Sequence, residues 1–555
     1  KQKTAYEIRL SLVGSEMCIR DSARAPPRVA ALLPACNAQD ISNTVWSFAS
    51  NDIRDARLFD AVDAFLVAEG VPETFGAQNV SNVAWSFAKV AMGSDALFGL
   101  LGDFAASIID QFSNQNCSNT LYAFALANRR HDAFFRSMCG EIVRQEAAWS
   151  PSGQDVANSA WALATIGLTV APAGDDKSQV KRRLEDGPDA DYFATAAFAA
   201  LSRAAVRVCG RGFNSQNIAN CAWAYARAGS RDTALFDALA RVAEPLLDGF
   251  KSQELANLAW AYAKLNLVER AQVLFLQLAR VAQAKLGRYN AQDVTNTLWA
   301  FATKDVAAPE LFETLSTAAL PLMDRFNAQD LGNTAWACAK ADKCDARLFQ
   351  RIEAQCCRTL HRFEPQNISN VVWSFATAGI PAPNLFRAVA DGIVEDGRRN
   401  SHRWRRFNAQ AFANLVWAYA TVKHDHPQMF DVIEHAAIQC FDQFDPQNLA
   451  NFAWAYATVE RASPQLFGAL AQALLPRLDD FIAEGLSSTA WAYAKAGIPA
   501  PALFREIAKR AQAKLGSFNH QALCVTRVPL RNISARWRGG CLRVLPQRHR
   551  RDVVP

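Results

Sequence analysis

Amide, aromatic and basic or hydroxyl side chains recur together along this sequence, and their spacing indicates which chemistry they could perform. In most copies a Gln is followed four residues later by Asn, seven residues later by Trp and eleven residues later by Lys, Arg or Thr. We call the Gln the anchor and number the other positions from it as +4, +7 and +11. Lys, Arg and Thr suit contacts with phosphate or sugar, and Trp offers a ring for stacking. The set therefore predicts ligand binding rather than covalent catalysis.

Sequence patterns typical of enzymes and metal sites are lacking. The chain has no P-loop, no nucleophile elbow and no H-E-x-x-H motif. His424-Asp425-His426 offers too few ligands for a metal site, and Cys356-Cys357 is interpreted as buried helix surface rather than a redox pair. We therefore predict a protein that is not an enzyme, without catalytic residues, metal, cofactor or small-molecule substrate.

The anchors belong to an internal repeat of about 37 residues. Eleven of the fourteen Trp lie seven residues after an anchor. A register kept by so many copies predicts an array of about twelve stacked units rather than several globular domains. The anchors are Gln39, Gln78, Gln115, Gln154, Gln216, Gln253, Gln292, Gln329, Gln366, Gln410 and Gln447, with Glu484 in the twelfth copy.

Each repeat carries the start and stop signals of two helices. Asn or Asp two residues before the anchor, such as Asn290, is a typical N-cap, and Pro365 occupies the first helical position of its copy. Gly229 and its counterparts end the first helix, and a Leu-Phe pair such as Leu235-Phe236 opens the second. No segment alternates with the period of a strand. The predicted fold class is all-α: an α-solenoid, a right-handed superhelix of about twelve helix pairs of 37 residues.

The first helix of each pair has two contrasting faces at 100° per residue. The apolar residues at +2, +6, +9 and +10 lie together and are predicted to form the core. The anchor, +4, +7 and +11 share the other side, so that stacking aligns them into one stripe. The candidate binding residues of this stripe are Lys89, Arg227, Lys264, Thr303, Lys340, Thr377, Thr421, Thr458 and Lys495 at +11, and Asn220, Asn257, Asn296, Asn333, Asn370, Asn414 and Asn451 at +4.

The stripe also has a purely structural interpretation. Large residues that recur in every repeat usually pack between neighbours, so we favour packing over ligand contact for the Trp and the anchor Gln. The Asn at +4 are left open between a side-chain ladder that ties repeats together and ligand contact. The variable residue at +1, such as Asp293 or Asn448, could read base edges, but we favour helix capping there.

Two insertions interrupt the repeat. One lies near residues 171–191 and is rich in Asp, Lys, Gly and Pro, which predicts an exposed loop. The other lies near residues 398–406 and gathers five Arg around one Trp. It could clamp a phosphate backbone while Trp404 stacks on a base, or be a solvated loop, and both interpretations stay open. Its candidate binding residues are Arg398, Arg399, Arg403, Trp404, Arg405 and Arg406.

The positive charge of the chain is concentrated at its two ends. The formal net charge is +6, but residues 524–555 carry +7 and residues 1–28 carry +3, so the predicted solenoid, residues 29–523, carries −4. We expect residues 1–28 to be a non-native or disordered leader, and residues 524–555 to be an irregular Arg-rich tail that follows a frameshift. Polar residues interrupt every long apolar stretch, so no membrane span is predicted. Nucleic-acid binding must therefore depend on where charges lie.

The repeat block is well represented by Phe326–Trp336, FNAQDLGNTAW, and Phe444–Trp454, FDPQNLANFAW. Over about residues 36–523 it resembles the heptatricopeptide and octotricopeptide repeats of organellar RNA-binding proteins. That group includes FAST-kinase-like proteins and the helical-repeat subunits of RNA-editing substrate-binding complexes. Many members also carry a RAP domain, and none is visible here.

The resemblance implies a sequence-selective reader of single-stranded RNA that acts in mitochondria, or alternatively in chloroplasts. It further implies work on transcript stability, processing, editing or ribosomal RNA maturation, together with other subunits of an organellar ribonucleoprotein complex. The alternative function is a protein–protein interaction scaffold of the armadillo or tetratricopeptide type, which the negative charge of the predicted solenoid favours.

Overall fold

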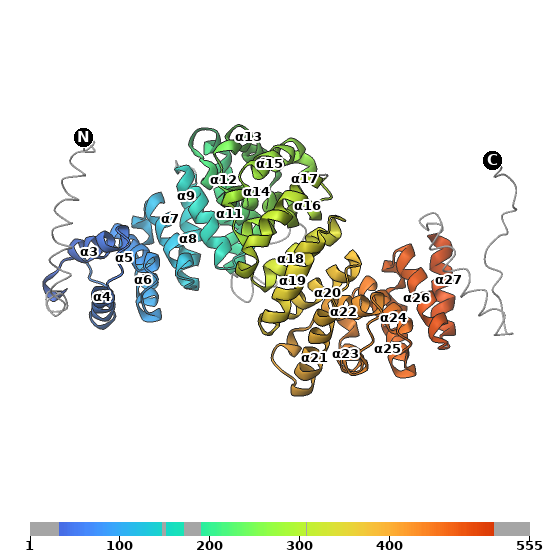
Figure 1. Ribbon diagram of the computed structural model, residues 1–555. Coiled ribbons are helices and arrows are strands. Elements are labelled where there is room, and N and C mark those ends of the chain that lie inside the picture. Colours follow the sequence, from blue (N-terminus) through green and yellow to red (C-terminus); the bar gives the residue numbers. More distant parts are fainter. Residues whose placement is uncertain (1–32, 147–150, 171–189, 307, 515–555) are drawn as a thin grey trace. The chain divides into compact units, whose positions relative to one another are not determined.

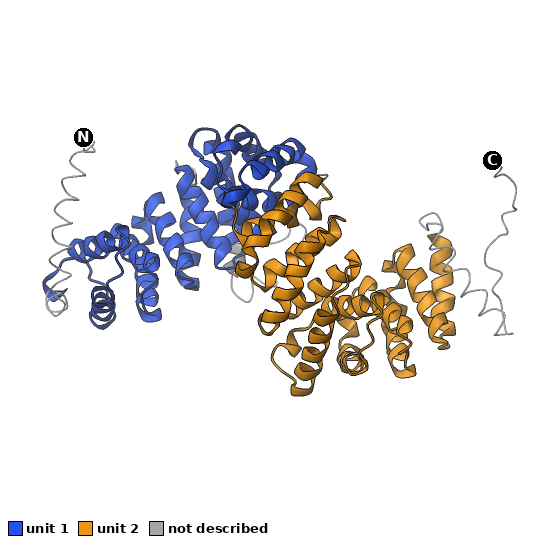
Figure 2. Ribbon diagram, viewed as in Figure 1, with its two compact units in different colours: residues 1–288 blue, residues 289–555 orange. Residues whose placement is uncertain are grey.

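The computed structural model describes residues 33–146, 151–170, 190–306 and 308–514 (Figure 1). Within these ranges the chain forms 24 α-helices and short 3-10 helices, and no strand. The predicted leader and Arg-rich tail, and most of the insertion near 171–191, lie outside the described residues. The chain divides into two compact units, Lys1–Arg288 and Tyr289–Pro555 (Figure 2), and each is described by itself.

Unit 1 contains six helix pairs in the residues that are described. The pairs are α3 (Ala38–Ser50) with α4 (Ala56–Glu69), α5 (Ala77–Lys89) with α6 (Asp95–Ser107), α7 (Asn114–Leu126) with α8 (Asp132–Gln145), α9 (Gly153–Thr165) with α11 (Ala190–Gly212), α12 (Ser215–Ala228) with α13 (Thr233–Ala243), and α14 (Ser252–Lys264) with α15 (Gln272–Ala284). The 3-10 helices are η1 (Leu33–Ala35), η2 (Ile109–Gln111), η3 (Glu244–Gly249), η4 (Val268–Ala271) and η5 (Leu286–Arg288).

Unit 2 contains six further pairs over its described part. They are α16 (Ala291–Thr303) with α17 (Pro309–Ala319), α18 (Ala328–Lys340) with α19 (Ala346–Thr359), α20 (Pro365–Ala378) with α21 (Pro383–Arg399), α22 (Ala409–Thr421) with α23 (Pro427–Ile438), α24 (Pro446–Thr458) with α25 (Pro464–Leu474), and α26 (Ala483–Ala496) with α27 (Pro501–Ala513). The 3-10 helices are η6 (Leu320–Arg325), η7 (Leu360–Arg362), η8 (Trp404–Arg406), η9 (Phe441–Gln443) and η10 (Leu475–Asp480).

Consecutive repeats stack within each unit. The first helices pack side by side in the order α3, α5, α7, α9, α12, α14 in unit 1, and α16, α18, α20, α22, α24, α26 in unit 2. Second helices contact second helices in the same way, as α21 does α23. This arrangement confirms the predicted α-solenoid and its helix pairs, while the handedness of the superhelix stays a prediction.

The first helices begin with the caps that the sequence predicts. The Asn290 side chain accepts a hydrogen bond from the Asp293 amide, and the Asp293 carboxylate accepts one from the Asn290 amide. The Asn327 and Asp330 side chains make the same reciprocal pair at the start of α18. The amides of the first helical turn, which have no partner within the helix, are satisfied in this way.

Each first helix is followed by a residue in the left-handed conformation, thirteen residues after the anchor. We call this position +13. Gly229 (φ 80°) and Gly379 (φ 65°) occupy it as expected, but Asp305 (φ 49°) and Glu460 (φ 58°) occupy it in other repeats. A left-handed residue ends the helix and turns the chain toward the second helix. Acidic residues at +13 therefore have their position set by the backbone turn.

The core lies where the apolar face was predicted. The residues at +2, +6 and +9 are buried in all twelve first helices, and the residue at +10 is buried in all but the last, where Ala494 is exposed. The Tyr at +9 also ties repeats together, because the Tyr456 hydroxyl donates a 2.7 Å hydrogen bond to the Phe430 carbonyl in the second helix of the preceding repeat. Burying a hydroxyl would be costly without such a partner.

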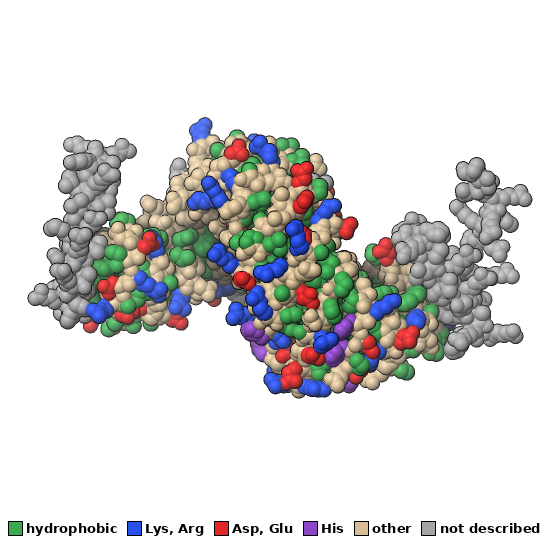
Figure 3. Space-filling model, in the orientation of Figure 1, with side chains coloured by type: hydrophobic (Ala, Val, Ile, Leu, Met, Phe, Trp, Pro, Cys, Tyr) green, Lys and Arg blue, Asp and Glu red, His purple; other side chains and the backbone are tan. Residues whose placement is uncertain are grey.

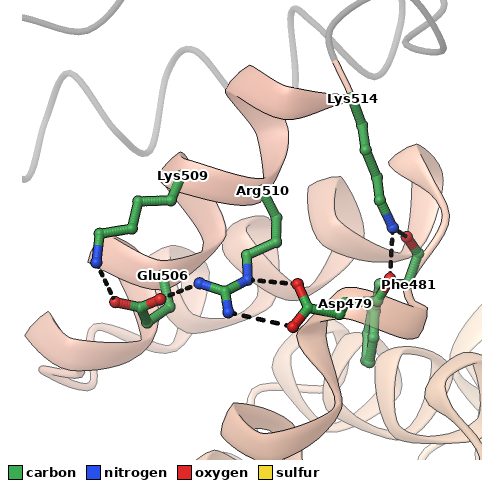
Figure 4. A network of polar contacts seen from close by, with 6 residues as sticks. All are labelled: Asp479, Phe481, Glu506, Lys509, Arg510 and Lys514. Atoms are coloured by element: carbon green, nitrogen blue, oxygen red, sulfur yellow. Dashed lines mark hydrogen bonds and ion pairs between the residues drawn. The ribbon is translucent and has the colours of Figure 1, made fainter.

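Several basic side chains are used to join neighbouring repeats. Figure 4 shows Lys514, whose Nζ donates to the carbonyls of Asp479 and Phe481 at 2.6 and 2.7 Å. Arg510 pairs with Asp479 at 2.9 Å in the same network. Lys285 donates to the carbonyls of Asp248 and Phe250 in unit 1 with the same geometry. These cations stabilise the stack, so the total of Lys and Arg overstates the charge available to a ligand.

One described helix has the length and apolarity that a membrane span requires. It is α11, over Phe193–Gly212, and half of this segment is buried. The helix packs against α8, α9 and α13. These contacts are those of a core helix in unit 1.

Candidate nucleic-acid interface

The predicted stripe lies on the surface of the first helices. The anchor Gln is exposed in all eleven repeats that have one. The Asn at +4 is half-buried from Asn82 to Asn451, and the Trp at +7 is half-buried in every copy except Trp46, which is 42% exposed. The structure thus brings amides and aromatic edges together on one face of each first helix.

The packing interpretation is confirmed for the Trp and wrong for the anchor Gln. Trp223 and Trp260 of neighbouring repeats lie with ring centroids 6.4 Å apart and planes 30° apart, and Trp454 and Trp491 repeat this geometry. These rings contact one another between repeats and keep one edge toward solvent. The Gln fills no core, because its side chain is exposed in each repeat that has one.

The Asn at +4 do not form a ladder. Among the described residues, the side chains of Asn220, Asn257, Asn296, Asn333, Asn370, Asn414 and Asn451 make no hydrogen bond to another part of the protein. A half-buried amide without a protein partner must satisfy its donors and acceptor with water or a ligand. The alternative in which these Asn tie repeats together is therefore not supported.

The variable residues at +1 serve as caps, as favoured. Asp293 and Asp330 are about 95% buried and bond to the backbone at the start of their own helices. Burial raises the pKa of both carboxyls, although the hydrogen bond from the cap backbone lowers it in part. Their burial keeps these two carboxylates from reading a base edge.

Three lysines at +11 are neutralised by ion pairs. Lys495 Nζ lies 2.9 Å from Glu460, and the hydrogen bond from Lys495 lowers the pKa of this Glu460 carboxyl. Two other +11 lysines pair at 3.0 and 3.6 Å with acids of the preceding repeat. These further pairs are Lys89 with Asp52, and Lys340 with Asp305.

Arg227 and Lys264 differ from those lysines. In the described part of the chain neither side chain pairs with a carboxylate. Arg227 lies 5.8 Å over the Trp223 ring and Lys264 lies 4.7 Å over the Trp260 ring, both within cation–π range. Burial lowers the pKa of Lys264, and the charge of the nearby Arg227 lowers it further.

The threonines at +11 are engaged to different degrees. Thr421 and Thr458 donate to the carbonyls of Trp417 and Trp454, one turn earlier in the same helix, at 2.8 and 2.7 Å. The hydroxyl of Thr303 is buried without a hydrogen-bond partner, and Thr377 is exposed. A hydroxyl bonded to its own helix can still accept one hydrogen bond.

The Arg-rich insertion is largely a structural element. Helix α21 continues through Arg399, so that the helix absorbs part of the inserted length before η8. Arg403 pairs with Asp396 at 2.5 Å and donates to the Leu360 carbonyl at 3.0 Å. Trp404 packs against Phe407 at 5.3 Å.

Its other arginines also have partners. Arg399 pairs with Glu395 and Arg406 with Glu364, while Arg398 and Arg405 donate to the amide oxygens of Gln428 and Asn400. The insertion lies at the start of α22, whereas +11 lies at the other end of each first helix. The structure does not bring the two candidate groups together.

The segment His424-Asp425-His426 has a structural role. His426 accepts a hydrogen bond from the Met429 amide at the start of α23 and lies 3.3 Å from Asp391. Asp425 pairs with Arg461 at 3.1 Å. These contacts give His426 and Asp425 partners within the protein.

On the face that Figure 3 shows, the Lys and Arg side chains of the described residues are interspersed with Asp and Glu, so neither charge dominates that face. This agrees with the negative net charge of residues 29–523. Sequence reasoning missed the acids at +13 that pair with +11 cations. Their recurrence at a fixed distance from the anchor was a visible signal, but their proximity to the next repeat requires the stack.

Comparison with known proteins identifies a related family. The family model described as RNA-editing substrate-binding complex 6 protein matches residues 24–169 and 269–398, slightly less than half of the chain. A second model, of a protein family of unknown function, matches residues 204–221 and 384–416. None of the curated proteins matches this chain.

Two structures of other helical proteins match this chain along most of its length. The full-length AP-3 complex, a homology model in an intermediate open conformation, is 10% identical and covers 94% of this chain and 95% of its own, with a TM-score of 0.31. The pentatricopeptide repeat protein PPR10 in complex with an 18-nt psaJ RNA element is 12% identical and covers 96% and 88%, with a TM-score of 0.20. The chain is a helical-repeat protein that is similar, over the two matched segments, to the RNA-editing substrate-binding complex 6 proteins.

Proposed function

We propose that this protein binds single-stranded RNA along the first-helix face and acts in organellar RNA metabolism, in transcript stability, processing, editing or ribosomal RNA maturation. The proposal rests mainly on the half-buried Asn at +4. Their amides have no hydrogen-bond partner among the described residues, and they lie beside Trp edges. The similarity to an RNA-editing substrate-binding family supports the same ligand class. Binding, rather than catalysis, is the proposed activity.

The physical basis is a surface suited to unstacked bases. Single-stranded RNA is bound by stacking of bases on aromatic rings and by hydrogen bonds to their exposed edges. An amide offers a donor and an acceptor, and Trp offers a π surface next to it. The same pair recurs in successive repeats, which matches a ligand that is itself a repeating polymer.

Sequence selectivity, the partners and the compartment belong to the same proposal. Invariant residues such as the Asn at +4 can hold every nucleotide alike, so selection must come from positions that differ between repeats. We place the protein with other subunits of a ribonucleoprotein complex, in mitochondria or alternatively in chloroplasts. Residues 29–523 remain the proposed solenoid, with the leader and tail outside it.

The test is a fluorescence-anisotropy titration of the full chain against a labelled random single-stranded RNA pool at several salt concentrations. The variant N220A/N257A/N414A removes three unpartnered amides and is expected to weaken binding. Its matched control is Q272A/Q350A/Q512A, which removes three exposed amides from the second helices α15, α19 and α27. Thermal unfolding followed by circular dichroism checks that both variants keep the fold.

The outcomes separate the two functional classes. Submicromolar, salt-dependent binding that falls in the Asn variant and not in the Gln variant supports RNA recognition by this face. Equal binding by the two variants would remove the stripe from the proposal. If the full chain binds RNA no better than it binds a neutral polymer, RNA binding is contradicted and a protein–protein scaffold is favoured. The net charge of −4 over residues 29–523 is the observation that supports a scaffold.

A further inference from the structure

We infer that Arg227 and Lys264 form the phosphate-anchoring subsite of the solenoid, and that the +13 residue of each repeat decides whether the +11 cation of the next repeat is available to RNA. This inference rests on the proposed function and assigns it to two neighbouring repeats, α12 and α14. It divides the +11 row, which looks uniform in the sequence, into paired and unpaired cations.

The paired state recurs with the same geometry at three places. In each, an acid at +13 of one repeat lies beside a Lys at +11 of the following repeat, as Asp52 lies 3.0 Å from Lys89. The acid is held in a left-handed turn, with φ of 56° at Asp52, 49° at Asp305 and 58° at Glu460. Stacking then brings the turn of one repeat next to the last helical turn of the next first helix.

The unpaired state arises where +13 is glycine. Gly167 precedes the repeat of Arg227, and Gly229 precedes the repeat of Lys264. Glycine supplies the same left-handed turn without a carboxylate. Arg227 and Lys264 lie over the Trp rings of their own helices, at 5.8 Å and 4.7 Å, as the paired Lys89 also does at 5.3 Å, so the missing carboxylate is what sets the first two apart.

Arg227 and Lys264 lie in adjacent repeats, and together they form a local concentration of positive charge. Burial lowers the pKa of Lys264 and the charge of Arg227 lowers it further, so the two cations lie close enough to repel one another. A phosphate that approaches this pair relieves the repulsion between the two charges. Trp223 and Trp260, 6.4 Å apart, lie beneath the same two cations, so a phosphate held by this pair would lie beside aromatic edges.

The remaining +11 positions do not reproduce this site in the described part of the chain. Lys89, Lys340 and Lys495 are paired, and Thr421, which follows Gly379, has no charge. The Arg-rich insertion pairs most of its charges within unit 2. Among the described +11 side chains, Arg227 and Lys264 are thus the cations without a carboxylate partner.

The first test compares two variants that remove the same charge. In R227Q/K264Q the full chain is expected to lose about tenfold or more in affinity for the random RNA pool, because two charge-assisted contacts are removed. The magnitude of the salt slope is expected to fall by roughly 0.7 for each lost phosphate contact. In K340Q/K495Q the affinity is expected to change by less than about twofold, since each of those cations already has a carboxylate partner.

The second test installs the missing acid. G229D places a carboxylate at the +13 position before Lys264, where a new Cβ meets no atom within 4 Å. Pairing with Lys264 is expected to lower RNA affinity toward that of K264Q. G229N is the matched control, because Asn tolerates the left-handed turn and occurs at +13 as Asn128 and Asn266.

The outcomes distinguish a failure of the anchoring subsite from a failure of the proposed RNA binding. Wild-type chain that binds RNA, with equal losses in R227Q/K264Q and K340Q/K495Q, would overturn the anchoring subsite and leave RNA binding intact. G229D that binds as G229N does would overturn control by +13. Wild-type chain without RNA binding would contradict the proposed function itself. Circular dichroism melts of all five variants show that a loss is not unfolding.

Discussion

The Tyr262 hydroxyl donates a 2.5 Å hydrogen bond to the backbone carbonyl of Phe236, across the boundary between two repeats. The two rings also meet edge to face, with centroids 5.0 Å apart. Tyr262 lies on the first helix of one repeat and Phe236 on the second helix of the repeat before it. The same bond recurs wherever +9 is Tyr, so the stack is held by directional contacts as well as by apolar burial.

Removal of this hydroxyl is expected to destabilise unit 1. Y262F keeps the ring and deletes the buried bond, so the free energy of unfolding should fall by about 1 kcal/mol. Urea unfolding followed by circular dichroism measures the change. Y122F is the control, since Tyr122 lies half-buried at +7 and its ring packs on Trp161. A loss no greater than that of Y122F would show that the bond does not hold the repeats together.

Asn in place of Asp330 is expected to raise the melting temperature at neutral pH. Burial raises the pKa of the Asp330 carboxyl, so its ionised form costs the folded state free energy at pH values above that raised pKa. As pH falls through the raised pKa, the wild type gains a proton and the advantage of D330N disappears. Thermal melts across a pH series check this direction. D40N is the control, because Asp40 makes the same cap while exposed; an equal effect there would refute burial as the cause.

RNA binding is expected to weaken as pH rises through the pKa of Lys264. Burial and Arg227 lower this pKa, so the free protein loses the proton at a lower pH than an exposed lysine does. Phosphate favours the charged form, and K264R keeps its charge throughout. Anisotropy titrations from about pH 7 to about pH 10 compare the two proteins. Parallel pH profiles for wild type and K264R would contradict a role for Lys264.

Release of a paired lysine is expected to create a new RNA contact. D305N removes the acid 3.6 Å from Lys340 and keeps a residue that accepts the left-handed turn. Affinity for RNA should rise, and the magnitude of the salt slope should increase by about 0.7 for one phosphate contact. E313Q removes the same charge from an exposed position on α17 and serves as the control. An equal gain in E313Q would mean that net charge alone is responsible.

The repeat, its helix pairs and its caps are local features, and the sequence determines them by itself. Asn290 and Asp293 are three residues apart, so a capping box needs no distant partner. The periodic apolar face likewise follows from helix geometry and identifies Tyr262 as core before any stacking is known. The predicted packing of the anchor Gln is wrong, because repetition alone does not distinguish a packed residue from a surface one.

Only the tertiary structure decides which +11 cations are free. Lys264 and Lys495 occupy the same position, follow the same Trp and read alike in the sequence. Stacking brings Glu460, 35 residues earlier, to 2.9 Å from Lys495, while Gly229 stands in the corresponding place before Lys264. The interaction between charges falls with their distance, and that distance is set by how one repeat packs on the next. Whether a +11 cation forms an ion pair is therefore decided by the +13 residue that stacking places beside it.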